Sequence, residues 1–178
     1  IYPETISGIT HVKYVHYDDL ENSITTIDPE RRKIKEIYDW NGNLTEFTAF
    51  GGPKTPADQA QHYYYAYDSL NRKISFTDPM GIVTVYRYDE RDLLTEQFYG
   101  SGTGSDFFTY NNLGQLEKKT DRKNQVIAFL YDELGRNTSA SHYLSEADFQ
   151  ISTVDHTVDI VYDNRGNAVR ISNQNLTE

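Results

Sequence analysis

The stretch Tyr131-Asp132-Glu133-Leu134-Gly135-Arg136 decides the fold, because a shortened form of it returns along the whole sequence. A tyrosine followed by aspartate, or once by asparagine, occurs at seven places: Tyr17-Asp18, Tyr38-Asp39, Tyr67-Asp68, Tyr88-Asp89, Tyr110-Asn111, Tyr131-Asp132 and Tyr162-Asp163. The steps between these tyrosines are 21, 29, 21, 22, 21 and 31 residues. Such a fixed spacing indicates a repeat protein, and insertions in connecting loops explain the two longer steps.

The residue three positions after each aspartate or asparagine has a type that suits a tight turn. Six of the seven positions hold Gly, Asn or Asp, which reach a left-handed backbone conformation at the least cost: Gly42, Asn71, Asp92, Gly114, Gly135 and Gly166. The aspartate that opens the turn can accept hydrogen bonds from the amides that follow it. We expect it also to pair with a neighbouring strand-end tyrosine. Glu21 holds this position in the first turn, which predicts a differently shaped turn there.

A second set of turns lies eleven residues after several of these tyrosines, at Asp28-Pro29, Asp78-Pro79-Met80-Gly81 and Asp121-Arg122-Lys123-Asn124. Each half-period of about ten or eleven residues therefore holds a turn and a strand of about six or seven residues. Residues 82–88 and 154–162 are rich in β-branched and aromatic side chains, which favour strands. The sequence predicts an all-β chain, an array of antiparallel β-hairpins in one long twisted sheet.

Several segments depart from the repeat. Residues 51–56 are rich in Gly and Pro and predict a loop, and residues 100–105 predict a flexible hairpin tip. Ser145-Glu146-Ala147-Asp148 has the spacing of a capping box and can start one helical turn. Another turn is due at residues 173–175. Neither end shows a polar cap, so we expect residues 1–178 to form a single array that is an excerpt of a larger one.

Composition restricts the class of partner. Seventeen Lys and Arg against 27 Asp and Glu give a net charge of −10, which argues against nucleic acid, because phosphates need an excess of cations. No apolar run approaches the roughly 20 residues of a membrane helix, so membrane insertion is not expected. The sequence has no Cys, which excludes disulfides and thiolate chemistry. Aromatic residues make up 13% of the chain, mostly Tyr, which suits a sheet that is wetted on one face.

No group of residues predicts catalysis, a metal site or a cofactor. The carboxylates follow the period of the turns, whereas catalytic carboxylates are placed by a site. The five histidines contain no helical metal-binding pair, and the acidic cluster Asp18-Asp19-Leu20-Glu21 lacks the ligand spacing of a calcium loop. The glycine-rich run at residues 100–104 is not followed by the helix that a phosphate cradle needs. We expect no enzyme activity.

One aromatic cluster could support a binding surface, because exposed rings stack on sugars or anchor partners. It consists of Tyr63, Tyr64 and Tyr65, together with Trp40 at a turn. Alternation along a strand places Tyr63 and Tyr65 on one face and Tyr64 on the other. The competing interpretation, which we favour, is cross-strand packing of tyrosines from adjacent repeats.

The repeated unit resembles the YD repeats of Rhs proteins, of the B and C subunits of insecticidal Tc toxin complexes, and of teneurins. Tyr67-Asp68-Ser69-Leu70-Asn71-Arg72 and the stretch that starts at Tyr131 carry the resemblance, which covers roughly residues 10 to 175. It implies a sheet of successive hairpins that spirals into a hollow shell. In bacterial members the shell ends in an autoproteolytic motif, and Asp78-Pro79-Met80-Gly81-Ile82 is only superficially close to it. We interpret that segment as an ordinary turn, because it is in register with Asp28 and Asp121.

Two functions follow from the resemblance. The first is a non-catalytic, secreted or cell-surface shell segment that encloses and helps deliver a toxin polypeptide, with the rest of the shell and the cargo as partners. The second is an adhesion or recognition module that binds a glycan or a protein receptor. Open sheet edges also predict self-association of the isolated chain.

Overall fold

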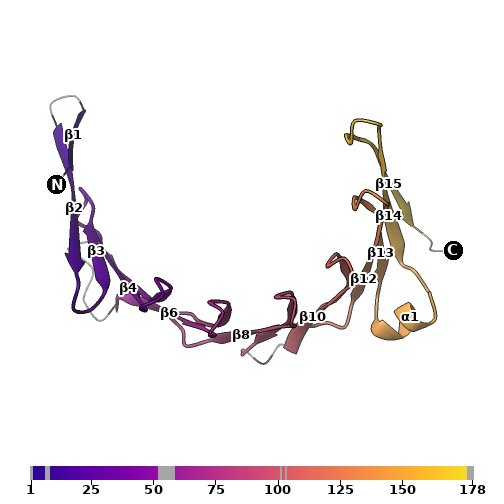
Figure 1. Cartoon of the computed structure of the whole chain (residues 1–178), viewed down its shortest axis with the longest axis horizontal. Coiled ribbons are helices and arrows are strands. Elements are labelled where there is room, and N and C mark those ends of the chain that lie inside the picture. Colours follow the sequence, from indigo (N-terminus) through magenta and orange to yellow (C-terminus); the bar gives the residue numbers. More distant parts are fainter. Residues whose placement is uncertain (1, 7–8, 52–58, 101, 103, 176–178) are drawn as a thin grey trace. The chain divides into compact units, whose positions relative to one another are not determined.

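The computed structural model of the chain describes residues 2–6, 9–51, 59–100, 102 and 104–175. It divides into two compact units, residues 1–85 and 86–178. The strands pair in sequence order from β1 to β15 within the described residues, and every strand pair with a recorded register is antiparallel. Figure 1 shows these strands as successive hairpins joined by tight turns. The chain is therefore all-β, as the repeat predicts, with one short helix among the described residues.

The first unit holds strands that are five to ten residues long. They are β1 (Tyr2–Ile6), β2 (Ile9–Asp18), β3 (Ser23–Ile27), β4 (Lys33–Tyr38), β5 (Leu44–Gly51), β6 (Gln61–Tyr67), β7 (Lys73–Thr77) and the first half of β8 (Val83–Tyr88). The second unit starts within β8. It holds β9 (Leu94–Tyr99), β10 (Gly104–Tyr110), β11 (Leu116–Thr120), β12 (Val126–Tyr131), β13 (Asn137–Tyr143), α1 (Glu146–Gln150), β14 (His156–Tyr162) and β15 (Ala168–Asn175).

In five hairpins the tyrosine that precedes the turn coincides with a change of register. Pairing shifts next to Tyr38, Tyr67, Tyr110, Tyr131 and Tyr162. A turn of this kind, closed by a residue with positive φ, forms a bulge that adds right-handed twist to the hairpin. The repeat therefore sets where the chain reverses and, in these five hairpins, where the register shifts.

Strand alternation and register show which residues lie on each face of the sheet in the second unit. Phe108 and Tyr110 of β10 lie on the same face as Phe129 and Tyr131 of β12. We call this the tyrosine face. The opposite face carries Val126, the one hydrophobic side chain among the described residues that is fully buried. Most other strand residues are half-buried, which agrees with a composition rich in tyrosine and poor in aliphatic side chains.

The helical turn expected after Ser145 is present as α1. The Ser145 hydroxyl accepts a hydrogen bond from the Asp148 amide at 3.1 Å, which caps the helix. The helix packs against the face opposite the tyrosine face, where the Phe149 ring meets the Tyr143 ring edge-on at 5.2 Å. The Glu146 carboxylate also pairs with Lys118 of β11 at 2.9 Å. No helix in the described part of the chain is long and apolar enough to cross a membrane.

At two places the structure differs from the turns that the sequence predicts. The turn expected at residues 173–175 is absent, because β15 continues through them and pairs with an extended β14, for example Asn173 with Val158. The hairpin tip expected at residues 100–105 is shorter, since Gly104 already pairs with Tyr99. The loop expected at residues 51–56 falls mostly outside the described residues, and Gly51 itself ends β5.

Candidate functional site: the tyrosine–aspartate turns

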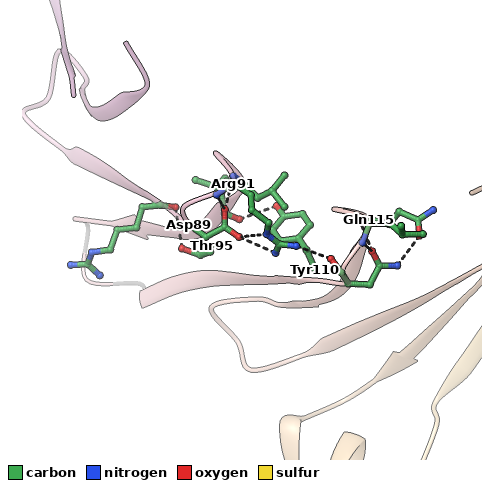
Figure 2. Close-up of polar contacts among 10 residues, drawn as sticks. Asp89, Arg91, Thr95, Tyr110 and Gln115 are labelled. Carbon is green, nitrogen blue, oxygen red and sulfur yellow. Dashed lines mark hydrogen bonds and ion pairs between the residues drawn. The ribbon is translucent and has the colours of Figure 1, made fainter. Parts of the chain in front are cut away.

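The turn between β8 and β9 shows how the aspartate closes a hairpin (Figure 2). The Asp89 Oδ1 accepts hydrogen bonds from the amides of Arg91 at 2.9 Å and Leu93 at 3.0 Å. The Asp89 amide donates to the Leu93 carbonyl at 2.9 Å, and the Asp92 amide returns to the Asp89 carbonyl at 3.2 Å. Asp92 has a φ of 64°, as the turn requires. The Leu93 amide and then the Arg91 contacts hold the pKa of the Asp89 carboxyl below its usual range.

The same arrangement is repeated along the chain. The side-chain Oδ1 accepts from the amides two and four residues further on at Asp39, Asp68, Asp78, Asn111, Asp121, Asp132 and Asp163. Asp78 and Asp121 belong to the half-period turns, so both sets of turns use one mechanism. The expected left-handed positions have φ between 62° and 85°. In Asp78-Pro79-Met80-Gly81 these bonds make an ordinary turn.

Sequence reasoning missed the residue four positions after the aspartate. Its side chain returns to the second carboxylate oxygen of the same turn, as Arg136 Nε does to Asp132 Oδ2 at 2.7 Å. The pKa of the Asp132 carboxyl is lowered first by this bond and then by the turn amides. Asn43, Arg72 and Asn167 hold the same position and make the same type of contact. In the asparagine turn the direction is reversed, because the Asn111 side-chain amide donates to Gln115 Oε1 at 2.7 Å. The signal was present in the sequence, because this column of the repeat holds a polar side chain in most turns.

The tyrosine hydroxyls join one hairpin to the preceding one. The hydroxyl of Tyr110 donates to the Leu94 carbonyl at 2.9 Å, and that of Tyr131 donates to the Leu116 carbonyl at 2.8 Å. Tyr162 donates to the Asn137 carbonyl at 2.9 Å in the same way. Each acceptor lies five residues after the aspartate or asparagine of the preceding turn. We call these three bonds the tyrosine ladder.

The tyrosine ladder corrects the expectation that the aspartate pairs with the tyrosine. The turn carboxylate is already engaged by amides, so the hydroxyl bonds to a backbone carbonyl. The Asp89 carboxylate acts on Tyr110 through its charge. Burial raises the pKa of Tyr110, and the negative charge of Asp89 raises it further.

Neighbouring turns also touch directly. The Arg91 Nη1 donates to the Asn111 carbonyl at 2.9 Å, which is visible in Figure 2. Gln115 Nε2 donates to the Gly135 carbonyl at 3.3 Å, and the Arg136 guanidinium lies 4.6 Å from the centre of the Tyr162 ring. These contacts link the Tyr88, Tyr110, Tyr131 and Tyr162 turns into one row within the second unit.

The first unit contains the exception that the sequence indicates. Positive φ in the first turn falls at Asn22, at 48°, instead of at Glu21. Tyr17 pairs with Ile24 without a register shift, and Asp18 Oδ1 accepts from the amides of Leu20 and Glu21. The Glu21 carboxylate forms an ion pair with Lys35. The acidic cluster therefore makes a turn of different shape.

The aromatic cluster is divided between the two faces of β6. Tyr63 and Tyr65 pack on Phe76 of β7, with ring centres 6.2 and 5.4 Å apart, and Tyr63 also meets Phe47 of β5. Tyr64 is on the other face and 46% exposed. Trp40, at the tip of the β4–β5 turn, is 92% exposed.

The described residues contain no group of three or more His, Asp or Glu side chains that could hold a metal ion. His62 Nδ1 lies 3.1 Å from the Thr48 hydroxyl and 3.4 Å from Glu46 on neighbouring β5. His142 and His156 stack on each other between β13 and β14.

The fold and its turns define a class of protein: a β-hairpin repeat protein whose turns are closed by carboxylates and whose hairpins are joined by tyrosines. The chain belongs to the teneurin YD-shell family, whose model matches residues 9–175. A search of curated proteins found no match. The chain is therefore a structural segment of the YD-shell type.

Solved structures of Tc toxins share the fold. A crystal structure of TcdB2-TccC3-Cdc42 matches with a TM-score of 0.68 and 12% identity over 95% of this chain and 11% of that chain. A structure of the Photorhabdus luminescens Tc holotoxin pore with a TccC3 mutation matches with a TM-score of 0.65 and 14% identity, over 95% of this chain and 10% of that one. A crystal structure of TcdB2-TccC3 without its hypervariable C-terminal region gives 0.63 and 15%, over 92% and 10%. The chain thus spans about a tenth of the chains it resembles.

Proposed function

We propose that this chain is one segment of the wall of a secreted or cell-surface YD shell, and that the shell encloses and helps deliver a toxin polypeptide. The rest of the shell and the cargo are its partners, and the segment itself is non-catalytic. The observation that carries the proposal is the tyrosine ladder, which bonds three successive hairpins of the second unit each to the one before it. The similarity to Tc toxin structures supports it at the level of fold.

The contacts of the wall suit containment. Side-chain oxygens and turn amides satisfy one another within each turn, so the edge of the wall formed by the turns has few polar groups left for a ligand. Within the described residues the strands from β1 to β15 are continuously paired, which leaves no lateral edge between them to which an enclosed chain could add. A wall of this kind holds a polypeptide by enclosing it and needs no specific binding pocket.

The test uses the full-length shell protein and a protease. The enclosed polypeptide should be digested far more slowly than the same polypeptide after release by denaturant. A shell with Tyr110→Phe and Tyr131→Phe should open more often and raise the digestion rate, whereas Tyr14→Phe, at a ring that is 53% exposed, should not. Equal digestion of enclosed and released polypeptide would contradict containment.

A second candidate function rests on Trp40. A tryptophan that is 92% exposed at a turn tip is unusual for a wall residue and is a typical anchor for a glycan or a protein receptor. A glycan array and a receptor pull-down with the chain test this function. Binding that is lost in Trp40→Ala but kept in Met80→Ala, another exposed turn residue without a ring, would favour recognition. Absence of saturable binding would favour the wall.

A further inference from the structure

His142 and His156 close the base of the insertion between β13 and β14. They are directly opposite each other in the register and form the last pair before the chain leaves the sheet. The Asp155 amide adds a bond to the His142 carbonyl at 2.8 Å. The insertion of residues 144–155, which contains α1, therefore begins and ends at this pair (Figure 1).

The two imidazoles are in close contact. Their ring centres are 4.1 Å apart and their planes differ by 11°, so the rings lie face to face. One carboxylate contacts the pair, since Asp155 Oδ2 lies 2.8 Å from His156 Nδ1. The charge of Asp155 also acts on His142, where it raises the pKa and offsets part of the lowering by burial and by His156. Neutral or singly charged rings stack well in this arrangement. Two imidazolium ions would place like charges about 4 Å apart and repel each other.

The other groups around the two rings supply little negative charge that could offset the repulsion between them. The pair lines a cavity of about 320 Å³, and the other charged groups at this cavity are Lys119 of β11 and Asp121 of the β11–β12 turn. The Lys119 ammonium is paired with Asp106 of β10 at 3.1 Å, and the Asp121 carboxylate accepts from its turn amides. On β12, the residue opposite His142 is apolar Ile127.

We propose that the stacked His142–His156 pair is an acid-sensitive seam: protonation of both rings opens the base of the α1 insertion and separates the end of β13 from β14. This property goes beyond the proposed wall function and does not depend on it. The pH range in which the seam opens follows from His142. Burial and then the charge of His156 lower the pKa of His142 below the usual value of about 6.5. A closed seam therefore binds fewer protons than an open one, so its stability is complete above about pH 6.5 and falls as the pH decreases toward the lower value.

The helix itself should stay in place while the seam opens. Its anchor is the Glu146–Lys118 pair, and this Lys118 contact lowers the pKa of the Glu146 carboxyl, which therefore remains charged in the same pH window. Phe149 also keeps its contact with Tyr143, which does not depend on charge. The response to acid is therefore confined to the two segments of the chain that enter and leave α1.

Hydrogen exchange of the 178-residue chain, followed by mass spectrometry, tests the seam. Rates at about pH 7.5 and about pH 5.5 are corrected for the intrinsic pH dependence of amide exchange. Peptides that cover residues 142–145 and 152–156 should exchange up to about tenfold faster at the lower pH, the effect of one proton over one pH unit. Peptides from residues 146–150 and from the first unit should not change.

Two variants and one control make the test specific. His142→Gln should abolish the pH-dependent increase, and His156→Gln should reduce it, because the repelling partner is lost while the burial of His142 remains. His62→Gln, which alters a histidine of the first unit, should retain the increase. The proposal is overturned if the wild-type peptides show no local increase, if the increase spreads over the whole chain, or if it persists in both seam variants. The wild-type result decides the matter even if a variant folds poorly.

Discussion

Replacing Tyr131 with phenylalanine removes one bond of the tyrosine ladder and leaves the ring in place. The lost contact is the 2.8 Å hydrogen bond from the hydroxyl to the Leu116 carbonyl. An intramolecular hydrogen bond contributes about 1 kcal/mol, and an acceptor left without a partner adds a further cost when it is shielded from water. Because Leu116 is half-buried, we expect a loss of about 1–2 kcal/mol.

The expected loss is measurable in the melting temperature of the chain. A domain of about 150–250 residues loses about 2–4 °C for each kcal/mol, so Tyr131→Phe should lower Tm by about 2–8 °C in calorimetry. Urea unfolding should show the same loss with an unchanged m value, since the exposed area on unfolding stays the same. Tyr110→Phe, which breaks the ladder between a different pair of hairpins, should add to the effect.

The matched control is Tyr14→Phe, which removes a hydroxyl from a ring that is 53% exposed. We expect it to leave Tm almost unchanged. If Tyr131→Phe and Tyr14→Phe melt at the same temperature, the hydroxyl of Tyr131 does not hold the hairpins together, and the role assigned to the ladder is wrong.

Four further predictions concern the turns and the core. Asp132→Ala should lower Tm more than Asp132→Asn, because asparagine keeps the acceptor for the turn amides and loses only the ion pair with Arg136; an equal loss would show that charge dominates. The lowered pKa of the Asp132 carboxyl predicts that the stability contributed by Asp132 is complete above the unfolded pKa of about 4 and is lost as the pH falls through the folded pKa. An acid titration followed by circular dichroism measures this loss. Gly135→Ala should cost about 1 kcal/mol in urea unfolding, since Gly135 has a φ of 78° and a new Cβ would lie 3.1 Å from Gln115. Val126→Ala should cost about 2 kcal/mol, because Val126 is fully buried; a loss below about 0.5 kcal/mol would show that this site relaxes freely.

The turns could be predicted because each depends on a few adjacent residues. Asn71 and Asp92 could be assigned positive φ from their type and spacing alone, and the structure has 62° and 64° there. Glu21 marked the one turn that differs, where Asn22 takes the left-handed position. The helical turn at Ser145 could be predicted for the same reason, since a cap is a local device.

The contacts between repeats could not be predicted, because they depend on the register of separate hairpins. A tyrosine at a strand end could reach the neighbouring aspartate or a backbone carbonyl, and only the bulge beside Tyr131 sets its hydroxyl against Leu116. The length of β15 was mispredicted for a related reason. β15 pairs with β14 along its whole length, from Tyr162 with Ala168 to His156 with Asn175, so the strand continues through the residues where a turn was expected.

The central feature is that side-chain oxygens close the turns after Tyr88, Tyr110, Tyr131 and Tyr162 in the same way. Amide hydrogen exchange followed by NMR tests this claim most directly, at the amides four residues after the turn aspartate or asparagine: Leu93, Gln115, Arg136 and Asn167. We predict that all of them exchange at least about 100-fold more slowly than in an unfolded chain, and that Asp132→Ala removes the protection at Arg136 alone. Exchange of these amides at unfolded rates in the folded wild-type chain would contradict the account.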